Sequence, residues 1–128
     1  MVSFDGNTGP DHQYAHARIG SIFRRAGVDR VAVRGLPIAV EAPQERALAL
    51  RLLAYPSAID ATLETYSTHK LCTYVYELAT DFTAFYEHCP VLKADEPLRS
   101  SRLALCDLTA RTLEHALGLL GIDAPEQM

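Results

Sequence analysis

The amino-acid sequence predicts an all-α fold, a single bundle of five helices around one core. Apolar residues recur at helical spacing in the long segments, and four prolines each stand just before an amphipathic stretch, where helices begin. No segment of any length alternates with the two-residue period of a strand. With 128 residues, 48% hydrophobic and 22% charged, the chain fits one globular domain.

The first predicted helix covers residues 10–26 and stops at Gly27. A loop is expected over residues 28–42, because a glycine and a proline within it interrupt any regular helix. Three of its apolar side chains are expected to pack against the core: Val31, Val33 and Ile38.

Two short helices are predicted next, at residues 43–54 and 56–66, each beginning with proline. The fourth helix has the clearest pattern and should end near Cys89, because the residue before a proline avoids the α region. Its apolar stripe consists of Leu71, Tyr74, Val75, Leu78, Phe82 and Phe85. The fifth helix is expected over residues 97–120, with Gly121 as its cap and residues 122–128 as a tail.

The apolar runs, the first residues and the cysteines of the sequence favour a cytoplasmic protein. No apolar run approaches the roughly 20 residues of a membrane span, and the first residues lack the features of a secretory signal. The three cysteines form no C-x-x-C pair, and their odd number argues against a disulfide framework. We therefore expect no membrane association and a reducing compartment.

The charge is unevenly distributed. The net charge is −4, but residues 12–36 contain five arginines and one acidic residue, a local charge of +4 that leaves −8 for the rest. The arginines are Arg18, Arg24, Arg25, Arg30 and Arg34. Such a strip can hold a phosphate backbone through counterion release, although a solvated helix face is the simpler interpretation of charge alone.

Three segments in register resemble one family. They are NTGP with QYAHARI at residues 7–19, YEL with FTAFYEHCPVL at residues 76–92, and LLGIDAP at residues 119–125 before the final Met128. Their order and spacing resemble the C-terminal, DALR-type anticodon-binding domain of class I arginyl-tRNA synthetases, over essentially the whole chain. Residues 1–9 then resemble part of the family's connector.

The resemblance implies a helical module that binds the anticodon region of an arginine-accepting tRNA. It assigns base contacts to Tyr14, Arg18, Tyr86 and Met128, and we add Arg24 and Arg25 as phosphate contacts. The physics of the residues agrees, because Tyr14 and Arg18 lie four apart on one helix face. Aromatic rings and guanidinium planes are platforms for unstacked RNA bases.

The sequence also departs from the family pattern. Asp11-His12 and Glu114-His115 stand where the family is less polar or more basic, and Gln127 stands where it usually has arginine. These departures keep an alternative hypothesis open, a freestanding descendant that binds a small molecule or acts as an enzyme. In that alternative the acid–base groups are Asp11, His12, Glu114 and His115.

The 128 residues contain neither a HIGH-like sequence nor a phosphate-binding glycine loop, so they are not expected to aminoacylate tRNA alone. Whether they form an enzyme of another kind is left open. No zinc-type ligand pairing is present, and no metal or cofactor is expected. The chain is either a fragment of a synthetase or a freestanding protein. Besides tRNA and a small molecule, a second copy of the chain is left open as a partner, in a homodimer.

Overall fold

The computed structural model describes the backbone of residues 5–121 and the side chains of residues 12–121. Within this part the chain is all-α, with one short 3-10 helix and no strand, as the sequence predicts. The bounds are α1 Asp5–Ala26, η1 Arg30–Val33, α2 Pro43–Leu53, α3 Tyr55–Thr65, α4 His69–His88 and α5 Leu98–Leu120. None of the described helices is both long and apolar enough to span a bilayer.

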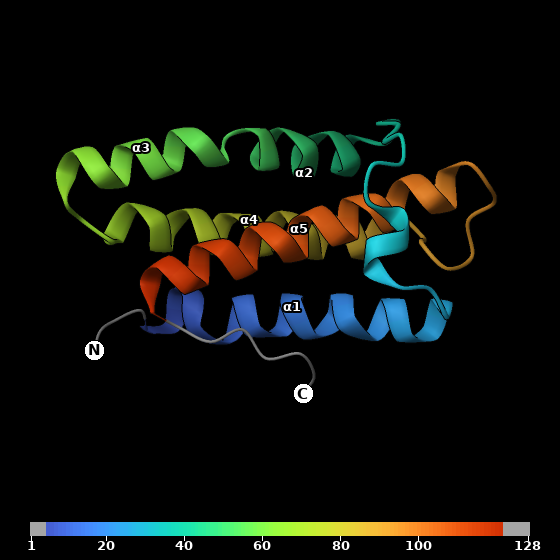
Figure 1. Ribbon diagram of the computed structural model, residues 1–128, viewed down its shortest axis with the longest axis horizontal. Helices are drawn as coiled ribbons and strands as arrows, with labels where there is room; N and C mark the ends of the chain where they lie inside the picture. Colours follow the sequence, from blue (N-terminus) through green and yellow to red (C-terminus); the bar gives the residue numbers. More distant parts are fainter. Residues whose placement is uncertain (1–4, 122–128) are drawn as a thin grey trace.

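The bundle is built from four helical rods, and the prediction of five is corrected in this respect. α2 and α3 lie end to end, separated only by Ala54, and together they pack along α4 (Figure 1). Pro56 stands in the first turn of α3, where its missing N–H is tolerated. The helix therefore restarts after one residue, and the two segments form a single interrupted rod.

α4 is the central element, because it packs against each of the other four α-helices. All six residues of the predicted stripe are buried, and Ala79 is buried with them. Each large apolar side chain buried here stabilises the fold by roughly 1.5–3 kcal/mol. The helix ends at His88, and Cys89 is extended before Pro90, as predicted.

α1 and α4 run side by side in the same direction, and α5 returns antiparallel to both (Figure 1). α1 begins at Asp5 and not at the predicted Pro10. Glycine and asparagine among residues 5–9 have low helix propensity, so the sequence pattern alone does not reveal this first part of the helix. It ends at Ala26 as predicted, with Gly27 at φ 69° in the left-handed region.

The segment between α1 and α2 is not wholly irregular, because it contains η1. Val33 is buried, as predicted, but Val31 and Ile38 are 67% and 39% exposed, which corrects the expectation that all three pack inward. A 3-10 helix has three residues per turn, so Val31 and Val33, two residues apart in η1, cannot face the same surface. Ile38 lies after η1, outside any helix.

Candidate nucleic-acid interface

Three residues predicted to contact bases meet on one face of the bundle. Tyr14 and Arg18 lie one turn apart on α1, and Tyr86 lies in the last turn of α4. The guanidinium carbon of Arg18 is 4.7 Å from the ring centroid of Tyr14 and 4.5 Å from that of Tyr86. Each such contact contributes about 0.5–2 kcal/mol, depending on its exposure to solvent. We call this arrangement the platform.

The platform is supported from below and accessible from outside. Phe82 stacks on Tyr86 with 6.4 Å between the ring centroids and 26° between the ring planes, which fixes the orientation of Tyr86. Tyr14 remains 45% exposed. The platform is therefore an ordered stack of planar groups with an accessible aromatic edge.

Two adjoining grooves flank the platform between α1 and α4. The platform groove is lined by Tyr14, Arg18, Phe82, Thr83, Tyr86 and Glu87. The α4 groove is lined by Tyr14, Ala79, Thr80, Thr83, Ala84 and Glu87. They share Tyr14, Thr83 and Glu87, whereas Arg18 lines only the platform groove.

The two predicted phosphate contacts, Arg24 and Arg25, are both exposed but point to different sides of α1. Consecutive helical residues are about 100° apart. Arg25 follows Arg18 by two turns and shares the face of the platform, whereas Arg24 lines a separate groove between α1, η1 and α5. Among the described residues, neither arginine has an acidic partner within salt-bridge distance, so both retain a charge for an external ligand.

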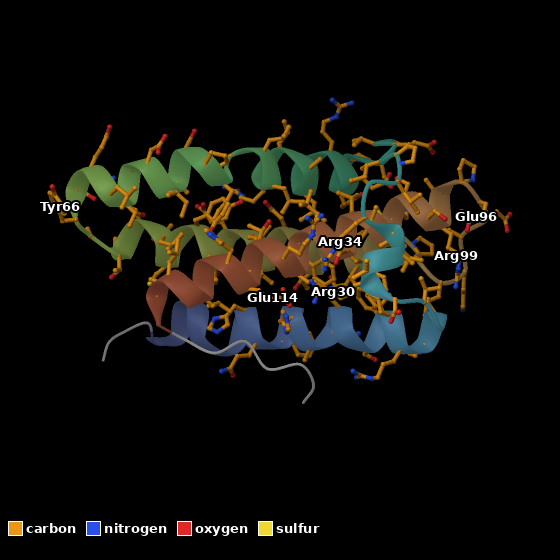
Figure 2. All side chains as sticks on the ribbon, in the orientation of Figure 1. Arg30, Arg34, Tyr66, Glu96, Arg99 and Glu114 are labelled. Atoms are coloured by element: carbon orange, nitrogen blue, oxygen red, sulfur yellow. The ribbon has the colours of Figure 1, made fainter. Side chains whose placement is uncertain are left out.

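The other two arginines of the basic strip are used inside the protein. Arg30 binds Asp107 at 2.8 Å and Glu114 at 2.7 Å, and Arg34 binds Asp107 at 3.0 Å. Figure 2 shows Arg30, Arg34 and Glu114 gathered where η1 crosses α5. Asp107 is fully buried and also binds Arg111 at 2.9 Å. We call this set the η1–α5 cluster.

The cluster keeps its carboxylates ionised. Burial by itself raises the pKa of Asp107, but the hydrogen bonds from Arg34 and Arg30 outweigh it and hold the pKa below its usual value. Glu114 behaves in the same way, because its hydrogen bonds to Arg30 and His16 outweigh burial and lower its pKa. Three arginines share these two carboxylates, so most of their charge is balanced within the cluster. The free positive charge of the strip therefore rests mainly on Arg18, Arg24 and Arg25.

Two acid–base residues of the alternative hypothesis, Glu114 and His115, have different partners. Glu114 bonds to Nε2 of His16 at 2.6 Å and to Arg30, whereas Nδ1 of His115 bonds to the Tyr55 hydroxyl at 2.7 Å on another side of α5. His12 is buried at 2% exposure, and the side chain of Asp11 lies outside the described residues. The structure therefore separates Glu114 from His115, and the catalytic alternative is not pursued.

Met128, the remaining predicted base contact, lies outside the described residues, so its role stays a prediction. Sequence reasoning missed Thr80, Thr83 and Glu87 in the grooves, because they become neighbours of Tyr14 only when α1 pairs with α4. It also missed Asp107, whose only signal is an acid within the otherwise apolar run of residues 103–108.

An all-helical bundle with an aromatic–arginine platform has the means that proteins use to bind unstacked nucleic-acid bases. The chain belongs to the DALR anticodon binding domain family, which it matches over residues 12–128.

Relatives of known identity point to one kind of protein. The chain is 57% identical to the arginine–tRNA ligase of Frankia casuarinae and 55% identical to that of Thermobifida fusca, in both cases over 100% of its own length. It covers only 21% and 22% of those two proteins, so it spans about a fifth of the length of the curated relatives it matches.

Solved structures agree with these relatives. Arginyl-tRNA synthetase from Thermus thermophilus superposes with a TM-score of 0.84 at 44% identity, over 98% of this chain and 22% of that chain. The enzyme from Plasmodium falciparum gives a TM-score of 0.84 at 34% identity, again over 98% and 22%. Both the fold and the sequence therefore place the chain among the anticodon-binding domains of arginyl-tRNA synthetases.

Proposed function

We propose that this chain binds the anticodon region of an arginine-accepting tRNA on the face formed by α1 and α4. The observation that carries the proposal is the platform, in which Arg18 lies between the rings of Tyr14 and Tyr86. Unstacked bases extend such a stack, and each base–aromatic contact is worth about 1–3 kcal/mol. Membership of the anticodon-binding family supports the same ligand.

The distribution of charge favours the approach of RNA to the α1 side of the bundle. Arg18 and Arg25 lie on the platform side of α1, so RNA that stacks on the platform meets both of them. Arg24 lies at the separate groove beside η1, where it is available only to RNA that extends around α1. The rest of the molecule is acidic, with a net charge of −4 for the whole chain. Phosphates are therefore attracted along α1 and repelled elsewhere. Met128 remains part of the proposed contact surface.

The test is a binding titration of an arginine-accepting tRNA at low salt with the wild type, Tyr14→Ala and Arg18→Ala. We expect each substitution to weaken binding by roughly tenfold or more, in keeping with the loss of one stacking contact. The matched controls are Tyr66→Ala, which removes a 96% exposed tyrosine at the end of α3, and Arg46→Ala, which removes an exposed arginine on α2. Equal affinities of all five proteins would refute the proposal.

The other predicted partners are not proposed. No feature of residues 5–121 favours a homodimer or a small-molecule ligand over RNA.

A further inference from the structure

The groove between α1, η1 and α5, which we call the η1 groove, lies apart from the platform. One wall comes from the second half of α1, the other from the α1–η1 turn and η1, and Ala110 of α5 lies between them. Its volume is about 880 Å³, within the range of roughly 300–1,000 Å³ that is typical of small-ligand sites. The groove therefore has room for one nucleotide.

The buried charged groups of the η1 groove are already engaged inside the protein. Arg30 donates from Nε to Asp107 at 2.8 Å, and from Nη1 and Nη2 to Glu114 at 2.7 Å and 3.2 Å. Nε2 of His16 bonds to the same Glu114 at 2.6 Å. Figure 2 shows Arg30 and Glu114 facing each other where η1 crosses α5. A ligand in the groove therefore meets these groups as a fixed and largely neutralised surface.

Two exposed residues that line the same groove carry charges that are not engaged. Arg24 comes from the last turn of α1, and Asp29 comes from the turn before η1. Asp29 stands at the N-cap position of η1, but its side chain makes no capping hydrogen bond. Among the described residues, no salt bridge joins the two or pairs either with another side chain. Both groups therefore remain available to an external ligand.

The groups of the η1 groove match the three parts of a ribonucleotide. The guanidinium of Arg24 attracts a phosphate. The carboxylate of Asp29 is an acceptor for a ribose hydroxyl, the contact that acidic side chains make in dinucleotide-binding sites. Val28 is half-buried and Val31 is 67% exposed, so a base seated in the groove covers apolar surface that the chain itself leaves in water.

The η1 groove also lies within reach of RNA on the platform. Arg24 and Arg25 are consecutive on α1, so their side chains are about 100° apart around the helix. Arg25 shares the face of the platform, and Arg24 lines the η1 groove. A strand that crosses α1 at its last turn therefore meets an unpaired cation on each side of the helix.

We propose that the η1 groove binds one ribonucleotide of the RNA held on the α1–α4 face, and that Asp29 recognises its 2′-hydroxyl. The proposal rests on the proposed function, because the nucleotide belongs to that RNA. The 2′-hydroxyl is the group by which a protein distinguishes RNA from DNA at a given site. The platform stacks bases and does not contact the sugar, whereas the η1 groove reads the sugar and accepts any base.

The experiment compares two hairpins that carry the anticodon stem and loop of an arginine-accepting tRNA. One has ribose throughout, and the other has 2′-deoxyribose at every loop nucleotide with the same bases. Because phosphates and bases are the same, the ratio of the two affinities reports recognition of the sugar. We expect the wild-type chain to bind the ribose loop roughly tenfold more tightly, the effect of one hydrogen bond to a charged acceptor. Asp29→Ala should remove most of that ratio.

The matched control is Asp60→Ala, which removes an exposed carboxylate on α3 and should leave the ratio intact. Tyr14→Ala should weaken binding of both hairpins equally and also keep the ratio. If Asp29→Ala changes both affinities by the same factor, Asp29 acts only through its charge and the proposal is wrong. If the wild type binds both hairpins equally, the subsite fails while the proposed function stands. If it binds neither hairpin nor the tRNA, both proposals fail.

A titration with adenosine monophosphate distinguishes a nucleotide of bound RNA from a free nucleotide. We expect this mononucleotide to bind only weakly, because it lacks the contacts that RNA makes with the platform. Binding at micromolar concentration that Asp29→Ala abolishes would mean that a free nucleotide occupies the groove, and the assignment to RNA would be wrong.

Discussion

At the scale of single residues, arginines of one basic strip have two different uses. Arg30 and Arg34 each bind the fully buried Asp107, whereas Arg18 packs between two aromatic rings and Arg25 is exposed on the same face of α1. A side chain that is neutralised by a carboxylate releases no counterions when RNA arrives. The local charge of the strip therefore overstates what it offers to a nucleic acid.

This difference can be measured through the salt dependence of RNA binding. Arg25→Ala should reduce the slope of log affinity against log salt concentration by about one, because one phosphate contact is lost. Arg34→Ala should reduce the slope by clearly less, because Arg34 already pairs with Asp107, a carboxylate that it shares with Arg30 and Arg111. Equal reductions in the two variants would contradict the assignment of Arg34 to an internal role.

A second residue-scale prediction concerns the buried pair of Glu45 and Arg102. Arg102 binds Glu45 at 2.9 Å and donates to the carbonyl of Pro90 at 2.7 Å, and Glu45 also accepts from the N–H of Ala42 at the start of α2. Removing one partner leaves a buried charge uncompensated.

Arg102→Ala should therefore lower the free energy of unfolding by about 3–5 kcal/mol, as measured by urea denaturation. Arg46→Ala, on the exposed side of the same helix α2, should change it by no more than about 0.5 kcal/mol. A change of that small size in Arg102→Ala would mean that water reaches the pair.

At the scale of elements, η1 is held on α5 chiefly by the η1–α5 cluster and by the burial of Val33. Both carboxylates of the cluster have lowered pKa values in the folded state. A group with a lowered folded pKa stabilises the protein fully above its unfolded pKa, about 4 for a carboxyl. That contribution is lost as the pH falls through the folded pKa.

The wild-type protein should therefore lose stability on acidification from neutrality to about pH 3. Asp107→Asn should lower the free energy of unfolding at neutral pH by roughly 1–3 kcal/mol, because the arginines lose an ionised acceptor. It should also show a shallower dependence on pH than the wild type in urea denaturation. Parallel pH profiles for the two proteins would contradict an ionised, arginine-bound Asp107.

The elements that the sequence predicts well are those whose periodicity settles their environment. The stripe of α4 predicts both its helix and its central burial, because all its large apolar residues fall on one side. The predicted start of α1 was wrong, because weak helix formers hide the first part of the helix. The predicted inward packing of Val31 and Ile38 was also wrong, because a single apolar residue in a loop does not show which way its side chain points. The end-to-end joining of α2 and α3 depends on packing against α4, which no local pattern records.

The residues of the candidate site were also predicted only in part. The pairing of Tyr14 with Arg18 follows from helical spacing, and Tyr86 follows from the family resemblance. Glu87 and the threonines of the α4 groove could not be found, because they depend on how α1 and α4 are aligned. The neutralisation of Arg30 and Arg34 likewise depends on Asp107, which lies far away in the sequence.

At the scale of the whole molecule, the face along α1 carries positive charge and the rest of the chain is acidic. The unneutralised arginines of the basic strip lie along α1, and the excess of acidic residues is spread over the rest of the chain. The association rate of RNA should therefore fall steeply with ionic strength, as stopped-flow mixing at several salt concentrations would measure. A salt-independent rate would mean that the surface field does not guide RNA to this face.

The platform exists only in the folded chain, because its two rings come from helices that are far apart in the sequence and meet only in the bundle. RNA held there binds the native state and has no equivalent site on the unfolded chain. By mass action it shifts the folding equilibrium, by about 2.7 kcal/mol at a hundredfold excess over its dissociation constant. Melting curves should therefore move to higher temperature with added RNA, and Tyr14→Ala should show a smaller shift. Conversely, a cavity made in the bundle interior, such as Leu78→Ala, should weaken the apparent affinity near its melting temperature without touching a ligand contact.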